Sequence, residues 1–138
     1  MIDGETVGAI GTGFVILLGV RHGDESGDAE FLAKKTASLR VFSDEEQRMN
    51  RSIGDVDGGA LVISQFTLYA DTRKGNRPSF IGAAEPELAE RLYEHYVACL
   101  RELLGEDRVA TGRFGAMMSV EIINDGPVTI ELNTDERG

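Results

Sequence analysis

The chain has 138 residues, which is a usual length for one domain, and we expect a single domain over residues 1–138. Its 41% hydrophobic content is typical of a globular protein that builds a core without a metal ion or disulfides. The single cysteine, Cys99, excludes an internal disulfide framework and a multi-cysteine zinc site. No apolar run approaches the roughly 20 residues that span a bilayer, and no signal peptide is visible, so we expect a soluble cytoplasmic protein.

The net charge of −10 argues against broad affinity for nucleic acids, since that affinity comes from neutralising phosphates. The basic residues are nevertheless clustered. Two windows, 72–84 and 108–120, contain no acidic residue, and their bases are Arg73, Lys74, Arg77, Arg108 and Arg113. These charges are either solvated loop residues or candidate contacts to the phosphates of an RNA end.

The first part of the chain predicts two strands and a helix. Thr6–Ile10 and Gly13–Val20 read as strands, and the apolar run within the second is typical of a strand buried on both faces. A helix is expected from a cap at Ser26 or Asp28 to about Arg40. Its inner stripe at helical spacing consists of Ala29, Leu32, Ala33, Thr36 and Leu39.

The middle of the chain predicts a short strand, a loop and a long strand. Val41-Phe42 is the short strand, and the polar, glycine-rich segment from Ser43 to Gly59 is expected to be a loop. Ala60–Tyr69 is rich in β-branched and aromatic residues, as strands are. A polar loop, Asp71–Pro78, follows it.

The last part predicts the clearest helix and then more strands. Pro86 suits the first turn of a helix that Gly105 ends. Its apolar face consists of Leu88, Ala89, Leu92, Tyr93, Tyr96, Val97, Leu100 and Leu104, and Cys99 is expected to join the core. The strands that follow are Arg108–Phe114, Met117–Ile123 and Val128–Leu132, before a polar tail, Asn133–Gly138, that we expect to fray. Short turns between strands imply largely antiparallel pairing, hence an α+β fold of twisted, mostly antiparallel sheets with two main helices.

Standard catalytic sets are missing from the sequence. The two histidines, His22 and His95, belong to no metal-binding motif, so we expect no metal and no cofactor. Ser64 and Thr67 carry hydroxyls but have no base nearby in sequence, and taken alone they read as hydrogen-bonding side chains of a sheet. Gly126-Pro127, taken alone, reads as a turn that enters a strand.

Three segments carry a resemblance that changes this interpretation: Ser64-Gln65-Phe66-Thr67-Leu68, Arg77-Pro78-Ser79-Phe80 and Asn124-Asp125-Gly126-Pro127-Val128-Thr129. In this order they resemble the D-aminoacyl-tRNA deacylase family. The similarity runs from about Asp3 to Leu132. Further matching strings are Arg40-Val41-Phe42, Met49-Asn50, Ala70-Asp71-Thr72 and Thr111-Gly112-Arg113-Phe114.

The resemblance implies an enzyme that hydrolyses the ester between a D-amino acid and the 3′ end of tRNA, and likewise removes glycine mischarged on tRNA-Ala. It implies a homodimer in which a cis Gly126-Pro127 inserts into the partner's site. The backbone carbonyls of this pair would hold the substrate amino group and exclude L side chains. Rigid backbone suits that task, because rejecting one enantiomer requires a clash that does not yield.

The resemblance also implies roles for the remaining site residues. Ser64 and Gln65 line the pocket, while the backbone amides of Phe66 and Thr67 stabilise the oxyanion. We expect the Thr67 hydroxyl to support this by hydrogen bonding, with a nucleophilic role as the alternative. Met118 lines an adenosine pocket or is plain strand core. The candidate contacts to tRNA phosphates are Arg73, Lys74, Arg77 and Arg113.

The family fold implied is a barrel-like core that here lacks the usual first strand. Relatives of this kind begin with an additional strand containing a Gln-Arg-Val-type segment, whose arginine braces the Gly-Pro loop, whereas Met1–Glu5 leads into the following hairpin. We therefore keep a second hypothesis, that of a truncated, inactive homologue that binds tRNA ends. A third hypothesis is an interaction protein unrelated to tRNA.

Overall fold

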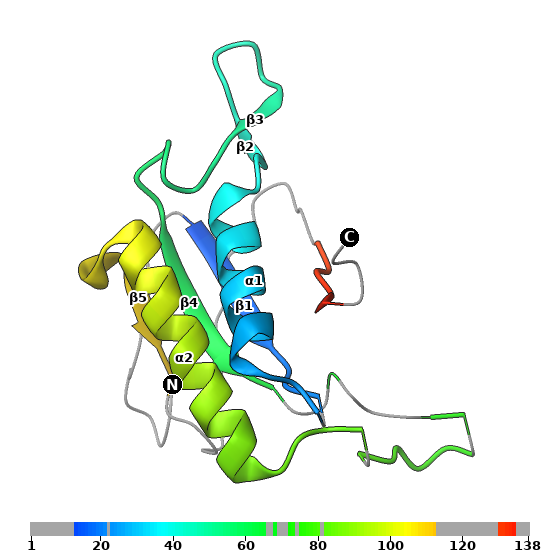
Figure 1. Ribbon diagram of the computed structural model, residues 1–138. Helices are drawn as coiled ribbons and strands as arrows, with labels where there is room; N and C mark the ends of the chain where they lie inside the picture. Colours follow the sequence, from blue (N-terminus) through cyan, green and yellow to red (C-terminus); the bar gives the residue numbers. More distant parts are fainter. Residues whose placement is uncertain are drawn as a thin grey trace, which may run out of the picture.

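The protein is described by a computed structural model that covers residues 13–21, 23–65, 68, 72–73, 75–80, 82–112 and 130–134. Two helices pack together over one face of a small sheet (Figure 1). The elements in chain order are β1 (Gly13–Leu18), α1 (Ser26–Ser38), β2 (Phe42–Ser43), β3 (Met49–Arg51), β4 (Gly59–Ser64), α2 (Pro86–Leu104), η2 (Glu106–Arg108) and β5 (Val109–Thr111). The α+β composition with two main helices is as predicted.

The described sheet is parallel, and the expectation of mostly antiparallel pairing is wrong for it. Its strand order is β1-β4-β5, with β1 parallel to β4 and β4 parallel to β5. The physical reason is connectivity: a helix lies between each pair of neighbouring strands, and such a crossover returns the chain to the same edge of the sheet. The antiparallel pair within the described ranges is the small β2–β3 hairpin.

The three described strands form an open sheet, with β1 and β5 at its edges, and the expected barrel-like closure is not seen in them. The predicted strands Thr6–Ile10 and Met117–Ile123 lie outside the described residues. Residues 130–132 of the predicted strand Val128–Leu132 are described and are not in a strand. The structure thus supports an α+β fold built on a parallel three-stranded sheet.

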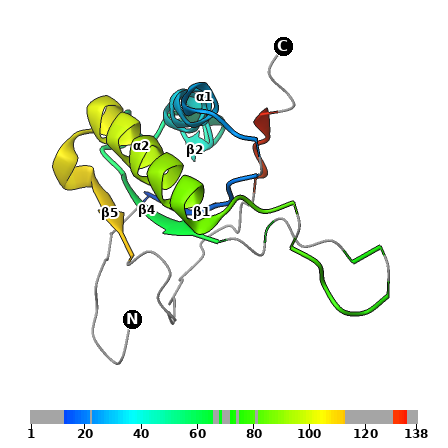
Figure 2. The same ribbon diagram turned by 60° about the horizontal axis from the view of Figure 1, so that its bottom comes forward.

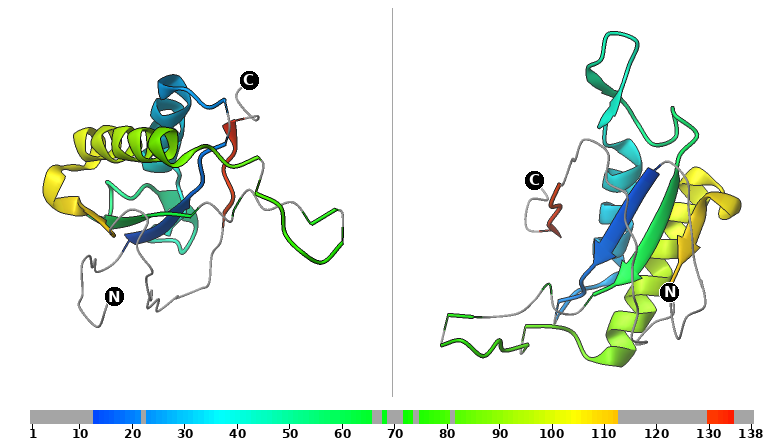
Figure 3. Two further views of the ribbon diagram at one scale, coloured as in Figure 1. Left: turned by 90° about the horizontal axis from the view of Figure 1, so that it is seen from below. Right: turned by 180° about the vertical axis from the view of Figure 1, so that it is seen from behind.

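Both helices lie on the same side of the sheet (Figures 2 and 3). The two strand–helix–strand connections move in the same direction across the sheet, from β1 to β4 and from β4 to β5. Because such crossovers share one hand, connections that move in the same direction place their helices on the same face. The other face carries Val15 and Leu17, which are 37% and 49% exposed in the described structure.

The core lies between the helices and the sheet. Its buried members are Ala29, Ala33, Ile53, Ala60, Val62, Tyr93, Tyr96, Val97, Leu100 and Val109. The predicted inner stripes of both helices contribute to it, and Tyr93 also donates a hydrogen bond from its hydroxyl to the carbonyl of Val62, at 3.0 Å. This bond and the apolar burial fix α2 against the middle of β4.

The helix boundaries follow from local chemistry. The cap of α1 is Glu25, whereas the sequence suggested Ser26 or Asp28; Asp28 instead lies in the first turn, where its carboxylate accepts the Glu25 amide at 2.8 Å. Pro86 begins α2 as predicted, and Gly105 ends it with a φ of 110°. Glycine adopts that conformation without the strain that a Cβ would bring.

Two strand predictions need correction. The strand expected over Ala60–Tyr69 is β4, which ends at Ser64, because its neighbour β1 ends at Leu18 and β5 pairs with β4 only as far as Val62. The segment expected to be loop between Ser43 and Gly59 contains β3, which is three residues long. Elements this short carry little periodicity to detect.

Candidate functional site

The carboxyl ends of the parallel strands meet at one edge of the sheet. β1 ends at Leu18, β4 ends at Ser64 and β5 ends at Thr111. Figure 1 shows this edge at the lower end of the sheet, where the long segment before α2 also begins and ends. In open sheets of parallel strands, ligands bind outside the carboxyl ends, because side chains and loops from several strands converge there. The first family motif starts at this edge.

Ser64 and Gln65 are the described residues of that motif nearest the edge, and both are half-buried. The Gln65 amide donates to the carbonyl of Leu18 at 2.8 Å, which prolongs the contact with β1 by one residue beyond β4. Leu68 then turns back, since its amide donates to the Gln65 carbonyl at 3.4 Å. The chain therefore leaves the sheet directly after Gln65, within the motif. Phe66 and Thr67 lie outside the described residues.

The segment from Thr72 to Ala84 leaves this edge and returns to it. Arg73 and Arg77 are exposed along it, and the second motif continues to Phe80, whose carbonyl accepts the Ala83 amide at 3.0 Å. The return is fixed by the Ala84 amide, which donates to the Val20 carbonyl at 2.9 Å. In Figure 3 the described part of this segment extends well away from the helices and the sheet. The described part of this segment therefore reaches beyond the carboxyl edge of the sheet.

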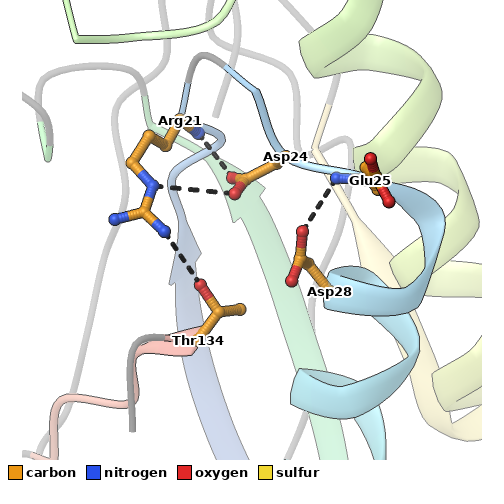
Figure 4. A network of polar contacts seen from close by, with 5 residues as sticks. All are labelled: Arg21, Asp24, Glu25, Asp28 and Thr134. Atoms are coloured by element: carbon orange, nitrogen blue, oxygen red, sulfur yellow. Dashed lines mark hydrogen bonds and ion pairs between the residues drawn. The ribbon is translucent and has the colours of Figure 1, made fainter. Parts of the chain in front are cut away.

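The turn after β1 carries a polar network that the sequence did not reveal (Figure 4). The Arg21 guanidinium donates to the Thr134 hydroxyl at 3.4 Å, and its Nε lies 3.8 Å from the Asp24 carboxylate. The Arg21 amide also donates to Asp24, at 2.7 Å. Thr134 belongs to the tail that we expected to fray, so this contact lies within that tail, whose residues 135–138 are outside the described part of the chain. Arg21 belongs to no motif, so the sequence pattern could not predict its contact with Thr134.

The remaining predicted site residues lie outside the described part of the chain: Phe66, Thr67, Lys74, Arg113, Met118, Gly126 and Pro127. The structure leads up to one of them, Arg113. The Gly112 amide, one residue before Arg113, donates to the Val62 carbonyl at 3.4 Å, which extends the β4–β5 pairing toward the same edge. The isomer of Gly126-Pro127 is likewise outside the described residues and stays a prediction.

His95, Glu30 and Cys99 form the described cluster that most resembles a catalytic set. His95 Nε2 lies 3.1 Å from the Glu30 carboxylate and 3.8 Å from the Cys99 sulfur. One ring nitrogen faces both partners, whereas a nucleophile–base–acid relay uses one nitrogen for each. Burial and the negative charges of Glu30 and Glu102 raise the pKa of the Cys99 thiol, which disfavours the nucleophilic thiolate. Cys99 is half-buried at the margin of the core, less enclosed than predicted.

In the described ranges, two aspartates have lowered pKa values, and both accept backbone amides in turns. The backbone amide of Arg48 lowers the pKa of Asp44, and the backbone amide of Ser52 lowers that of Asp55. Both belong to the segment between α1 and β4, at the far end of the sheet from the candidate site in Figure 1. Among the described residues, no three His, Cys, Asp or Glu side chains are placed to hold a metal ion. No helix in the described ranges has the length and apolarity needed to cross a membrane.

Comparison with known proteins decides the family. A family model for D-Tyr-tRNA(Tyr) deacylase matches residues 1–133. The chain belongs to this deacylase family. The D-aminoacyl-tRNA deacylase of Chloroflexus aurantiacus is 58% identical to it over 135 residues, 98% of this chain and 83% of that protein. That of Thermus aquaticus is 54% identical over 136 residues, 99% of this chain and 88% of that protein. The resemblance inferred from the three motifs is confirmed.

Solved structures share the deacylase fold. The structure of a c-Myc DNA Unwinding Element Binding Protein superposes with a TM-score of 0.91 at 40% identity, and the match covers 96% of this chain and 89% of that one. A probable eukaryotic D-amino acid tRNA deacylase superposes with a TM-score of 0.74 over 86% of this chain and 83% of that one. Its identity is 15%, so that likeness shows the fold alone.

Proposed function

We propose that this chain hydrolyses the ester bond of D-aminoacyl-tRNA, releasing the D-amino acid and free tRNA. The observation that carries the proposal is the identity of 52–58% with proteins named D-aminoacyl-tRNA deacylase, over at least 94% of this chain. The match of the family model over residues 1–133 supports one deacylase domain across 1–138. Glycine mischarged on tRNA-Ala is a second substrate. Because aminoacyl-tRNA is consumed in translation, we place the protein in the cytoplasm.

The reaction needs oxyanion stabilisation more than a strong nucleophile, because the aminoacyl ester is already reactive. The backbone amides of Phe66 and Thr67 supply it, and one such donor is worth about 2.7–4 kcal/mol. What supports this role is the position of Ser64 and Gln65, which bring the motif to the carboxyl edge and hold it there through the bond to Leu18. A water molecule attacks the carbonyl carbon, and the ester bond to the ribose oxygen breaks.

Chirality is selected by backbone. In a homodimer, Gly126-Pro127 of one subunit in the cis form enters the site of the other, where its carbonyls bind the substrate amino group and clash with an L side chain. Met118 contacts the terminal adenosine. A cis proline bond isomerises over tens of seconds or longer, so the Gly126-Pro127 backbone keeps its conformation while a substrate binds. The family membership supports this arrangement.

The tRNA backbone is bound by Arg73, Lys74, Arg77 and Arg113. Arg73 and Arg77 are exposed on a segment that extends beyond the sheet edge, which supports this role. The helix layer carries the same negative charge as phosphates, since α2 exposes Glu87, Glu90, Glu94 and Glu102. Coulomb repulsion over this layer and attraction along 72–84 favour approach of the tRNA from the loop edge.

The experiment that tests the proposal compares matched D-Tyr-tRNA and L-Tyr-tRNA, with Gly-tRNA-Ala as a third substrate. We expect rapid release of D-tyrosine and glycine and no release of L-tyrosine above the spontaneous rate. Equal cleavage of both enantiomers would overturn chiral selection. Binding without any cleavage, measured by competition with uncharged tRNA, would favour the inactive end-binding homologue instead.

A further inference from the structure

The carboxyl end of β1 is where three separate segments of the chain are joined. The Leu18 carbonyl accepts the Gln65 amide, which fixes the first family motif. Two residues later, the Val20 carbonyl accepts the Ala84 amide, and Arg21 pairs with Ala83 in an isolated antiparallel bridge. These backbone contacts join β4 and the returning 72–84 segment to the same short stretch of chain.

The Arg21 side chain adds the third segment. Its guanidinium donates to the Thr134 hydroxyl at 3.4 Å, across 113 positions of sequence (Figure 4). Thr134 lies in the described segment 130–134, which follows the Asn124–Thr129 motif directly in the chain. Ile130 in this segment is 47% exposed, so apolar burial does little to hold its first residue. Polar contacts therefore matter more here than in the core.

Asp24 sets the direction of the guanidinium. Its side chain is 12% exposed, and its carboxylate accepts the Arg21 amide at 2.7 Å while facing Arg21 Nε at 3.8 Å. An ion pair at this distance favours orientations of the guanidinium that keep Nε toward the carboxylate and leave the other nitrogens for Thr134. Lysine offers one ammonium nitrogen at the end of a flexible stem, so it cannot reproduce both contacts in this geometry.

We propose that Arg21 is a positioning residue for the deacylation site, through the contact that links it to Thr134. It holds Thr134, in the segment that follows the Gly-Pro motif, at the turn after β1. The inference rests on the proposed function for its effect on catalysis. The anchoring itself is a separate physical statement, which can be measured without any substrate.

The kinetic test uses Arg21→Met, which keeps much of the apolar stem, and Thr134→Val, which removes the hydroxyl at nearly constant volume. We expect each to lower kcat for D-Tyr-tRNA by about two- to tenfold, the range of one partly exposed hydrogen bond, with KM unchanged. The double variant should be no slower than Arg21→Met alone, because that substitution already removes the contact that Thr134→Val breaks. Thr134→Ser should retain wild-type kcat, whereas Arg21→Lys should not.

The matched control is Arg48→Met, the same substitution on the β2–β3 hairpin, where the Arg48 side chain is 80% exposed. It should leave kcat and KM unchanged. A wild-type kcat in Thr134→Val, or losses that multiply in the double variant, would overturn the positioning role. Thr134→Val also keeps the test open should Arg21→Met fold poorly.

The anchoring test measures amide hydrogen exchange over residues 130–134 in the full-length protein without substrate. Arg21→Met and Thr134→Val should both speed exchange there, and the amides of α2 should stay as protected as in the wild type. If both variants exchange at the wild-type rate over residues 130–134, the inference is wrong, even if their kcat is lowered. A wild-type protein that fails to release D-tyrosine would instead count against the proposed function and leave this readout standing.

Discussion

A buried hydrogen bond joins α1 and α2, and we expect removal of its two partners to lower stability by different amounts. Thr36 Oγ1 lies 2.9 Å from the hydroxyl of Tyr96 and 2.7 Å from the carbonyl of Leu32. The threonine has one hydroxyl proton, and Leu32 offers only an acceptor, so Thr36 donates to Leu32 and Tyr96 donates to Thr36. Tyr96 is 1% exposed, so water offers it little as a replacement acceptor.

The two substitutions therefore leave different groups unsatisfied. Tyr96→Phe removes a donor and leaves the Thr36 hydroxyl with its bond to Leu32, which should cost about 1 kcal/mol. Thr36→Val keeps the shape of the side chain but strands the Tyr96 hydroxyl, which should cost about 2–3 kcal/mol. The double variant leaves no stranded hydroxyl, and its cost should not exceed that of Thr36→Val alone.

Urea denaturation at pH 7, followed by circular dichroism, measures all three free energies of unfolding. The order expected is Thr36→Val less stable than Tyr96→Phe, with a double variant far from additive. If Tyr96→Phe proved as costly as Thr36→Val, the assigned direction of the hydrogen bond would be wrong. Purely additive losses would show that the two hydroxyls are not coupled.

The raised pKa of Tyr96 predicts that the free energy of unfolding decreases in alkali. Burial raises the pKa of Tyr96 to about 12 from an ordinary value of 10.0, so the folded state favours the neutral phenol. The resulting stabilisation is complete below pH 10 and is lost as pH rises from 10 to 12, by about 2–3 kcal/mol at most. Denaturation at several pH values should show a shallower loss for Tyr96→Phe than for the wild type. Equal slopes would contradict this assignment.

Three further outcomes are expected. Gly13→Ala should destabilise by about 3 kcal/mol or more, since its Cβ would lie 1.7 Å from the Gly59 oxygen, whereas Gly27→Ala in α1 meets open space and should be neutral or stabilising; equal melting temperatures would refute this. Arg73→Ala with Arg77→Ala should weaken tRNA binding and flatten its logarithmic salt slope by about 0.7 per lost contact, while an unchanged slope removes both from the interface. Thr67→Ala should keep substantial deacylation, and complete loss in a folded protein would contradict a merely supporting role for its hydroxyl.

The helices and the buried strands could be predicted because their apolar residues recur at a fixed period. The stripe that includes Ala29, Ala33 and Thr36 predicted α1, and Pro86 with Gly105 bounded α2. The direction of β1, β4 and β5 was mispredicted because short turns between strands were taken as the guide. The alternation of strand, helix and strand was present in the sequence, and it implies parallel neighbours.

The site divides in a similar way. Motif strings identified the family and placed Ser64 and Gln65 in it, since two unusual strings in order are specific. The Arg21–Thr134 contact could not be predicted, because its partners lie 113 positions apart and neither belongs to a motif or an apolar stripe. Spatial neighbours of this kind follow from how β1, the 72–84 segment and the tail come together, which no local pattern records.

Parallel pairing also determines when the sheet can form. Gly13 pairs with Gly59, and Ala60 pairs with Val109, so each ladder closes a loop of more than 40 residues. Such contacts form later than local ones, because the chain entropy of the loop is lost before any ladder bond forms. On a ribosome, β1 emerges well before β4, its partner in the described sheet, and α1 can form before the β1–β4 ladder does. During that interval the apolar run of β1 lacks the cover that β4 and α2 later supply, and we expect a chaperone to bind the nascent chain there.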